Sequence, residues 1–314
     1  MTNFFLGLDS SAYTTSVAVV DDNKKLVCDY RKVLKVKKGK RGLRQQEAVF
    51  QHIKNFPLLF DELSKKIDLS LIKSVAVSTK PRNIENSYMP VFKVSESIGR
   101  VFSNSRKIPF LEYSHQDGHI ASGYFDSNIK GSRILLIHIS GGTTELLLIT
   151  KKNSGYNIEI IGGTKDISAG QLIDRIGVKI GALFPCGKKL DEISKMGNIM
   201  KKIPVSTKKE WINFSGAETY FLRLLESKDY SHKDISRSVF HLITLSLANI
   251  IKYSIKKYDI EDVMIVGGVA ANSYLRENLK KHIQGGNVYF PKKEFCTDNA
   301  IGLAYLSYLN NHER

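Results

Sequence analysis

Short apolar runs alternate with polar turns through the first third of the chain. Residues 4–9 form one apolar run, and after polar residues 10–14 a second run follows at 15–20, which predicts a β-hairpin. Residues 46–66 instead carry apolar side chains at the three- and four-residue spacing of an amphipathic helix. The same criteria predict further strands and one further helix. These are strands at residues 26–33, 72–78 and 108–113 and a helix at 91–104.

The second half of the chain repeats this order of elements. Residues 134–149 are typical of two strands around a glycine pair, and 262–266 of a buried strand that ends in glycines. Helical spacing is predicted over residues 168–182, 188–197, 235–251 and 270–282. Strands that alternate with helices predict an α/β fold in which helices cover the sheets. Because a hairpin with a polar turn opens each half, we expect a duplicated domain with a cleft between the copies.

The composition is that of an ordinary globular chain. Of 314 residues, 42% are apolar and 25% are charged. The sequence has no run of about 18 consecutive apolar residues, and its start does not resemble a signal peptide. Its three cysteines lie far apart, without a C-x-x-C pair. We therefore expect a cytoplasmic protein, outside any membrane, without a disulfide framework or a zinc ribbon.

The charge adds one further indication. The formal net charge is +16, and such a surplus attracts polyanions, although a generally lysine-rich proteome would produce the same value. Residues 31–44 concentrate eight basic side chains together with two glycines. This segment is interpreted either as a flexible, solvated loop or as a nucleic-acid contact, and the sequence leaves both open.

His115 and His119 form the most informative pair in the chain. Ser114 before them is a candidate N-cap, and residues four apart in a helix share one face, so both imidazoles can reach one cation. Imidazole suits iron, zinc, nickel or copper better than magnesium. Gln116 stands where an H-E-x-x-H metalloprotease has its glutamate, so the spacing does not indicate that enzyme class. Surface histidines also reach this spacing by chance.

Three further segments each allow a structural and a functional interpretation. Residues 140–144, Ser-Gly-Gly-Thr-Thr, are either a phosphate-binding loop or a tight hairpin turn. Residues 266–272 join a buried strand to a helix through glycines, which is typical of an anion site but also of a plain junction. Asp298, just before an apolar helix at 300–308, is either a helix cap or a metal ligand.

Taken in this order, the segments resemble one family. Those that carry the resemblance are His115-x-x-x-His119, Ser140–Thr143, Gly267–Asn272 and Phe295–Asn299. From about Phe4 to Tyr308 the chain resembles the TsaD-like tRNA threonylcarbamoyladenosine synthase family, also called the glycoprotease or O-sialoglycoprotein endopeptidase family. The resemblance implies an α/β fold of two ribonuclease-H-like lobes of the actin, Hsp70 and sugar-kinase type, with a cleft between them. We expect the lobes at residues 1–128 and 129–295, with a C-terminal helix at 296–314 packing back on the first.

The resemblance also implies the site residues. The family's two histidines and one aspartate, which bind a divalent metal ion, iron or zinc, match His115, His119 and Asp298. Ten further positions match residues through which the family contacts substrate and nucleotide. These are His138, Ile139, Ser140, Gly141, Gly142, Thr143, Asp174, Gly187, Asp191 and Asn272.

The implied reaction is transfer of a threonylcarbamoyl group from its adenylate to an adenosine of tRNA next to the anticodon. The implied ligands are the metal ion and an adenylate or ATP-type nucleotide, and the implied partners are tRNA and the accessory subunits of the transfer complex. The metal would act as a Lewis acid, the turn at 140–143 would stabilise negative charge, and a basic surface would hold the tRNA backbone.

Several positions depart from the family pattern. An acidic pair after the first strand appears here as Tyr13 and Thr14, which leaves Asp9 as the remaining acidic candidate for catalysis. A glutamate–arginine signature on the first helix appears as Gln46 and Phe50. The other departures are residues 80–86 in place of a Gly-Pro-Gly loop, Thr143 in place of a histidine, Gln171 in place of a glutamate and Glu218 in place of a lysine.

Three functions fit these observations. The first is the metal-dependent transferase, and the second is a catalytically altered paralogue that binds nucleotide and acts as a regulatory or binding module. The third is an ATP-dependent sugar or acyl kinase, which requires a catalytic acid near the first turn, where Asp9 is the candidate. A peptidase has no support, because neither a hydrolytic glutamate motif nor a nucleophile–base pair is visible.

Overall fold

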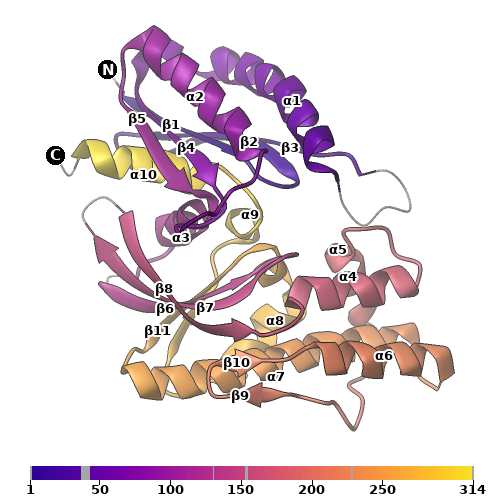
Figure 1. Cartoon of the computed structure of the whole chain (residues 1–314). Coiled ribbons are helices and arrows are strands. Elements are labelled where there is room, and N and C mark those ends of the chain that lie inside the picture. The colour runs from indigo at the N-terminus through magenta and orange to yellow at the C-terminus, as the bar shows by residue number, and fades with distance from the viewer. Residues whose placement is uncertain (1, 37–42, 130, 153–154, 228, 313–314) are drawn as a thin grey trace.

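Two β-sheets lie one above the other, with helices between them and on their outer faces (Figure 1). The computed structural model describes residues 2–36, 43–129, 131–152, 155–227 and 229–312. The first sheet has the strand order β3-β2-β1-β4-β5, and the second has the order β12-β11-β6-β7-β8-β10-β9. The alternation of strands and helices that the sequence predicts is therefore present in both halves of the chain.

The first sheet is formed by the N-terminal third of the chain. Its strands are β1 (Phe4–Ser10), β2 (Thr14–Asp21), β3 (Leu26–Val33), β4 (Ile72–Lys80) and β5 (Phe110–Ser114). β1, β2 and β3 are antiparallel neighbours, whereas β4 runs parallel to β1 and to β5. The helices α1 (Gln45–Lys66) and α2 (Phe92–Arg106) cover one face, and a 3-10 turn (Leu69–Leu71) leads into β4.

The second sheet is larger and carries most of the remaining helices on its outer face. Its strands are β6 (Arg133–Ile139), β7 (Thr144–Lys152), β8 (Gly155–Thr164), β9 (Thr207–Lys208), β10 (Trp211–Ile212), β11 (Asp262–Val266) and β12 (Asn287–Tyr289). The longer helices are α4 (Ala169–Lys179), α5 (Gly187–Ser194), α6 (Ser215–Ser227) and α7 (His232–Tyr258). Leu247 of α7 packs with Leu135 and Ile137 of β6 in the largest apolar cluster.

α3 (His115–Asp126) and α10 (Ile301–His312) fill the layer between the two sheets (Figure 1). α10 packs on β1, β2 and β4, and both helices join an apolar cluster with β6, β7 and β11. The C-terminal helix, yellow in Figure 1, therefore lies beside the indigo β1 strand. This return of the chain carries residues from its far end to the first sheet.

The segment predicted as one helix over residues 270–282 is divided into three short helices, which corrects that prediction. They are a 3-10 turn (Gly268–Ala271), α8 (Ser273–Asn278) and a second 3-10 turn (Leu279–His282). Asn272 causes the first division, because its side chain accepts a hydrogen bond from the Leu275 amide and so begins α8.

α7 is the one helix in the described ranges that is long and apolar enough to cross a membrane by length and composition. Of its most apolar 18-residue window, 67% is buried inside the protein. The core helix of a globular protein passes the same test, and the packing of α7 under the second sheet agrees with that role.

Glycines allow α10 to cross α3 at close range. A Cβ atom added at Gly302 of α10 would collide with the carbonyl oxygen of Gly118 and the amide nitrogen of Ser122 on α3. Both obstacles are backbone atoms, so one helix would have to shift as a whole.

We predict that Gly302→Ala lowers the free energy of unfolding by about 1–3 kcal/mol or more, because overpacking would force α10 and α3 apart. Urea unfolding monitored by circular dichroism measures the change. Gly216→Ala in α6 is the matched control, since a Cβ atom there meets nothing within 4 Å. That variant should be neutral or slightly stabilised. Equal stability of the two variants would contradict the close crossing.

Candidate metal and ligand site

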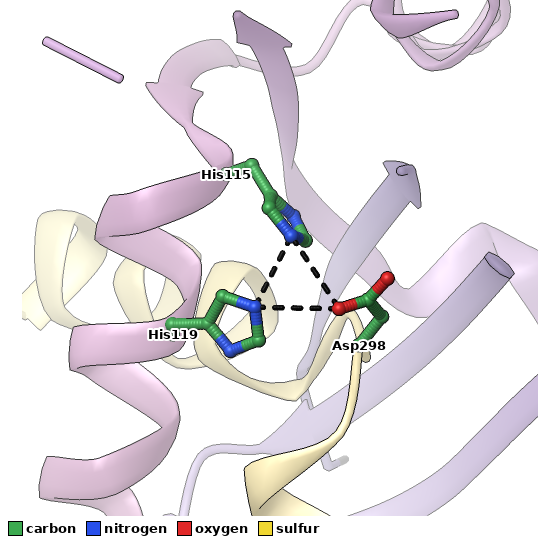
Figure 2. A group of neighbouring side chains, drawn as sticks. All are labelled: His115, His119 and Asp298. Carbon is green, nitrogen blue, oxygen red and sulfur yellow. Dashed lines mark hydrogen bonds and ion pairs between the residues drawn. The ribbon is translucent and has the colours of Figure 1, made fainter. Parts of the chain in front are cut away.

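The first two turns of α3 hold the two histidines on one face. Ser114 caps this helix as predicted, because its hydroxyl accepts a hydrogen bond from the Asp117 amide at 3.1 Å. Asp117 accepts one from the Ser114 amide in return at 2.9 Å, which completes a capping box. The cap fixes the start of the helix, so His115 and His119 lie one turn apart and point the same way (Figure 2).

Asp298 completes a group of three potential metal ligands. It lies between α9 (Lys293–Cys296) and α10, where the chain returns to α3. The Nε2 atoms of His115 and His119 are 3.1 Å apart, and the Oδ1 atom of Asp298 lies 3.6 Å and 3.4 Å from them, respectively (Figure 2). The structure thus brings together three residues that the sequence analysis matched to a metal site.

These distances fit a divalent cation. Nitrogen and oxygen ligands lie about 2.0–2.2 Å from zinc, so two of them are about 3.0 Å apart at a right angle and about 3.4 Å apart at a tetrahedral angle. The three ligand atoms lie within 4.8 Å of one another. Two imidazoles and a carboxylate suit iron or zinc and leave coordination positions for a substrate. That the residues bind such an ion stays a prediction.

A buried aspartate orients the first histidine. Asp9, at the end of β1, is fully buried, and its Oδ1 accepts a hydrogen bond from the Nδ1 atom of His115 at 3.0 Å. A proton on Nδ1 leaves the Nε2 lone pair directed at the cation position, as carboxylate partners do for metal-binding histidines. Ser11 similarly donates to Oδ2 of Asp298 at 2.5 Å. Asp9, the remaining acidic candidate for catalysis, is therefore a partner of His115.

The charges in this cluster compensate one another. Burial would lower the pKa of His115, but the Asp9 and Asp298 carboxylates outweigh burial and hold it well above its usual value. Burial would raise the pKa of Asp298, but the two histidines hold it well below its usual value. The raised pKa of His115 favours a proton on its imidazole in the absence of a cation, and a metal ion would bind in competition with that proton.

Arg31 holds the segment that carries Asp298. Its Nη1 donates to the Thr297 hydroxyl at 2.8 Å and to the Asp298 carbonyl at 3.3 Å, and its Nη2 donates to the Glu294 carbonyl at 2.7 Å. Asp29 pairs with the same guanidinium at 2.5 Å. The basic segment 31–44 therefore begins with a structural arginine in β3, while its residues 37–42 lie outside the described residues.

A pocket of about 590 Å³ opens beside the three potential ligands. Its lining comes from both sheets and includes six of the ten residues matched to ligand contacts. These are His138, Ser140, Gly141, Gly142, Thr143 and Asp174. The candidate metal ligands and the glycine turn therefore face one shared space.

The turn from Ser140 to Thr143 is a tight link between β6 and β7. The Ser140 amide donates to the Thr143 carbonyl at 2.8 Å, and the Thr143 amide donates to the Ser140 hydroxyl at 3.1 Å. A Cβ atom added at Gly141 or Gly142 would meet nothing within 4 Å, so the space beside both is open. The start of α4 abuts the turn, because Ser168 donates to the Gly141 carbonyl at 2.8 Å. A helix N-terminus beside an open turn favours an anion.

His138 is a third buried histidine at this site. Its ring centroid lies 5.0 Å from that of His119, and within the described chain neither of its ring nitrogens has a hydrogen-bond partner. Burial, together with the charges of His119, His115 and Arg82, holds its pKa well below the usual value. His138 lines the pocket, and its two buried ring nitrogens are polar groups that the described chain leaves without hydrogen-bond partners. Ile139 next to it is fully buried in the core.

Asp174 and Tyr13 approach the pocket from opposite sheets. Asp174 of α4 accepts a hydrogen bond from the Cys186 amide at 2.8 Å, and burial raises its pKa. Tyr13, in the turn after β1, meets the ring of Phe184 at 5.9 Å, and burial with the charge of Asp174 raises its pKa. Thr14, the other member of the replaced acidic pair, is buried in β2. Tyr13 and Phe184 thus line the pocket together.

Two of the remaining matched residues, Asp191 and Asn272, meet at the start of α8, and Gly187 begins α5. Asn272 donates to Oδ1 of Asp191 at 2.8 Å, and the Ser273 amide donates to Oδ2 of Asp191 at 3.0 Å. Neither Asp191 nor Asn272 belongs to the lining of the pocket as far as the described residues form it, and the same holds for Gly187. Their contact with a nucleotide stays a prediction.

The sequence patterns do not predict the contacts of two arginines at this site, Arg31 and Arg82. Arg31 contacts Thr297 and Asp298, which lie far from it in the sequence, so no local spacing could predict these contacts. Arg82 forms an ion pair with Glu145 at 2.6 Å on the pocket wall. It lies in the loop that departs from the family pattern, and that departure is the signal that could have singled it out. Gln46 and Phe50, two other departures, line a separate surface groove on α1.

Comparison with known structures concerns the fold. HypF of T. kodakarensis superimposes with a TM-score of 0.64 at 14% identity, over 98% of this chain and 48% of HypF, so the chain spans about half of that protein. The (R)-2-hydroxyglutaryl-CoA dehydratase component A of Acidaminococcus fermentans gives 0.58 at 15% identity over 99% of both chains. A ROK family glucokinase of Streptomyces griseus gives 0.53 at 10% identity, over 97% of this chain and 98% of that one. These similarities confirm the predicted α/β fold of the actin, Hsp70 and sugar-kinase type.

Sequence comparison identifies the family. The chain matches the family profile described as tRNA N6-adenosine threonylcarbamoyltransferase over residues 30–305. A protein of that name from Thermotoga neapolitana is 30% identical over 96% of this chain and 93% of its own length. A probable bifunctional tRNA threonylcarbamoyladenosine biosynthesis protein from Methanocaldococcus jannaschii is 29% identical over 97% of this chain and 55% of its own length. The chain belongs to the tRNA N6-adenosine threonylcarbamoyltransferase family.

Proposed function

We propose that this protein transfers a threonylcarbamoyl group from its adenylate to an adenosine of tRNA next to the anticodon. The observation that carries the proposal is that His115, His119 and Asp298 line the same pocket as the Ser140–Thr143 turn. A cation site and an oxyanion-binding turn around one space suit a substrate that joins an acyl group to a phosphate. Membership of the family supports the same reaction.

The two lobes divide this work. We assign the first lobe to residues 1–128, with α10 (Ile301–His312) in place of the expected helix at 296–314 returning to it, and the second lobe to residues 129–295. Asp9 and Ser11 of the first lobe orient His115 and Asp298. The second lobe supplies the glycine turn. One divalent ion, iron or zinc, held by His115, His119 and Asp298 would act as a Lewis acid when bound.

The transfer itself follows a simple balance of bonds. N6 of the acceptor adenosine forms a bond to the carbonyl carbon, the bond from that carbon to the phosphate oxygen breaks, AMP leaves, and N6 loses a proton. Negative charge gathers on the carbonyl oxygen and on the departing phosphate. The backbone amides of Gly141 and Gly142, beside which space is open, would stabilise that charge. His138, neutral and without partners within the described chain, would add a hydrogen bond to the ligand.

The partners follow from charge and from the family. A net charge of +16 suits the phosphate backbone of tRNA. We also expect accessory subunits of the transfer complex and a location in the cytoplasm. The name of the bifunctional archaeal relative joins this activity to a second one on the same chain, which agrees with work in a complex.

A second candidate function is nucleotide binding without transfer. The observation in its favour is that residues at replaced positions make contacts at the pocket: Tyr13 contacts Phe184, and Arg82 contacts Thr143. A catalytically altered paralogue with a regulatory or binding role would keep the pocket and lose turnover.

The metal proposal predicts that His119→Ala abolishes metal binding, because the variant loses one of only three protein ligands. Apo-protein reconstituted anaerobically with Fe²⁺ or Zn²⁺ and then desalted should carry about one metal ion per chain, and the variant should carry almost none. Metal content is measured by mass spectrometry. His232→Ala, at an exposed position of α7, is the control and should bind like the unmodified protein. If the His119→Ala variant carries as much metal as the unmodified protein, the proposed metal site is wrong.

The transfer proposal predicts that the purified protein, with metal, accessory subunits, cognate tRNA and threonylcarbamoyl-adenylate, forms modified adenosine. Nucleoside mass spectrometry of the digested tRNA measures the product. His115→Ala should reduce its formation at least about 100-fold, because both the cation and the orienting contact to Asp9 are lost. Nucleotide binding without any product, with all components supplied, would favour the altered paralogue instead.

A further inference from the structure

Arg82 reaches from the loop after β4, on the first sheet, to the glycine turn of the second sheet. Its Nη1 atom forms an ion pair with Oε1 of Glu145 at 2.6 Å, and its Nη2 donates to the Thr143 hydroxyl at 3.1 Å. Gln116, in the first turn of α3, donates to the other carboxylate oxygen of Glu145 at 3.0 Å. The guanidinium is therefore held in one position between the histidine helix and the turn.

The guanidinium also faces the ligand pocket. The side chain of Arg82 is 32% exposed, whereas that of Glu145 is 11% exposed, so the carboxylate supports the arginine from the buried side. Arg82 lines the same pocket as the candidate metal ligands and the turn. Its charge also contributes to the low pKa of His138, so the two side chains are electrostatic neighbours.

An arginine held in this way is prepared to bind an anion. Guanidinium has five N–H donors, and the contacts to Glu145 and Thr143 account for two of them. Because the carboxylate fixes the orientation, an incoming phosphate or carboxylate would find the remaining donors already arranged. The open turn at Gly141 and Gly142 lies beside the same space and attracts the same kind of group.

The contact joins two departures from the family pattern. Residues 80–86 replace a glycine-rich loop, and Thr143 replaces a histidine, yet Arg82 and Thr143 meet directly. A guanidinium therefore lies in the loop that replaces the glycine-rich one, at the wall of the pocket. Such a change at a pocket wall alters which ligand groups are held.

We infer that Arg82 is a specificity-determining residue that binds an anionic group of the ligand, either the phosphate of the adenylate or the carboxylate of the threonylcarbamoyl group. This inference rests on the proposed function and narrows it to a ligand whose anionic group lies against the 140–143 turn. The alternative is that Arg82 only ties the two sheets together through Glu145.

Isothermal titration calorimetry of the full-length protein with AMP, adenosine and N-carbamoyl-L-threonine distinguishes an arginine that binds the ligand from one that only joins the two sheets. We expect Arg82→Gln to weaken binding of AMP, of N-carbamoyl-L-threonine or of both by about 10-fold or more, because a charged hydrogen bond is lost. Adenosine, which lacks an anionic group, should bind unchanged. Loss confined to AMP assigns the phosphate, and loss confined to N-carbamoyl-L-threonine assigns the carboxylate.

The matched variants exclude a merely structural effect. Glu145→Gln breaks the ion pair but keeps the guanidinium, so anion binding should persist, whereas the double variant R82Q/E145Q should bind anions as weakly as Arg82→Gln. Arg100→Gln, which removes a half-exposed charge on α2, controls for net charge. Equal weakening in Glu145→Gln and Arg82→Gln, or no weakening in Arg82→Gln, would overturn the inference. If the unmodified protein binds neither AMP nor adenosine, the proposed function is rejected, and this inference with it.

Discussion

The packing of α10 between the two sheets is the contact on which the candidate site depends. α10 lies against β1 and α3, and the residues just before it include Asp298. Gly7 of β1 and Gly302 of α10 permit this approach, because a Cβ atom at either position would collide with neighbouring backbone. If α10 moved outward by the width of a methyl group, Asp298 would leave the reach of the two histidines.

The same packing buries several ionisable side chains close together. Burying a charged group raises the free energy of the folded state unless the charge is paired. Asp9 is fully buried beside His115, and Asp298 lies beside both histidines, so each carboxylate has an imidazole partner. Ser11 and Arg31 add hydrogen bonds that fix Asp298 and its segment. These hydrogen bonds hold the side chains in place before any ligand arrives, and such preorganisation favours metal binding and oxyanion stabilisation.

The sequence patterns predicted those features of the site that depend on residues close together in the chain. The spacing of His115 and His119 and the cap at Ser114 are confirmed, because a helix start depends on neighbouring residues alone. The break at Asn272 was missed, since a residue that caps one helix can equally continue another. The meeting of Asp298 with the histidines was expected only through the family resemblance, because no spacing within one segment encodes it.

The contacts that could not be predicted are those between segments far apart in the sequence. The segment 31–44 was interpreted as a solvated loop or a nucleic-acid contact, but its first residue, Arg31, contacts Thr297 and Asp298. Arg82 and Glu145 meet only because the two sheets face each other. In both cases the charge was visible in the sequence, while its partner was supplied by tertiary structure.

X-ray absorption spectroscopy of the protein reconstituted with iron or zinc addresses the cation site most directly. We expect two imidazole nitrogens and one carboxylate oxygen at about 2.0–2.2 Å from the metal, with an additional change in the coordination shell when AMP enters the pocket. A shell that contains no imidazole, or one that does not respond to AMP, would contradict a cation held by α3 and Asp298 beside the nucleotide.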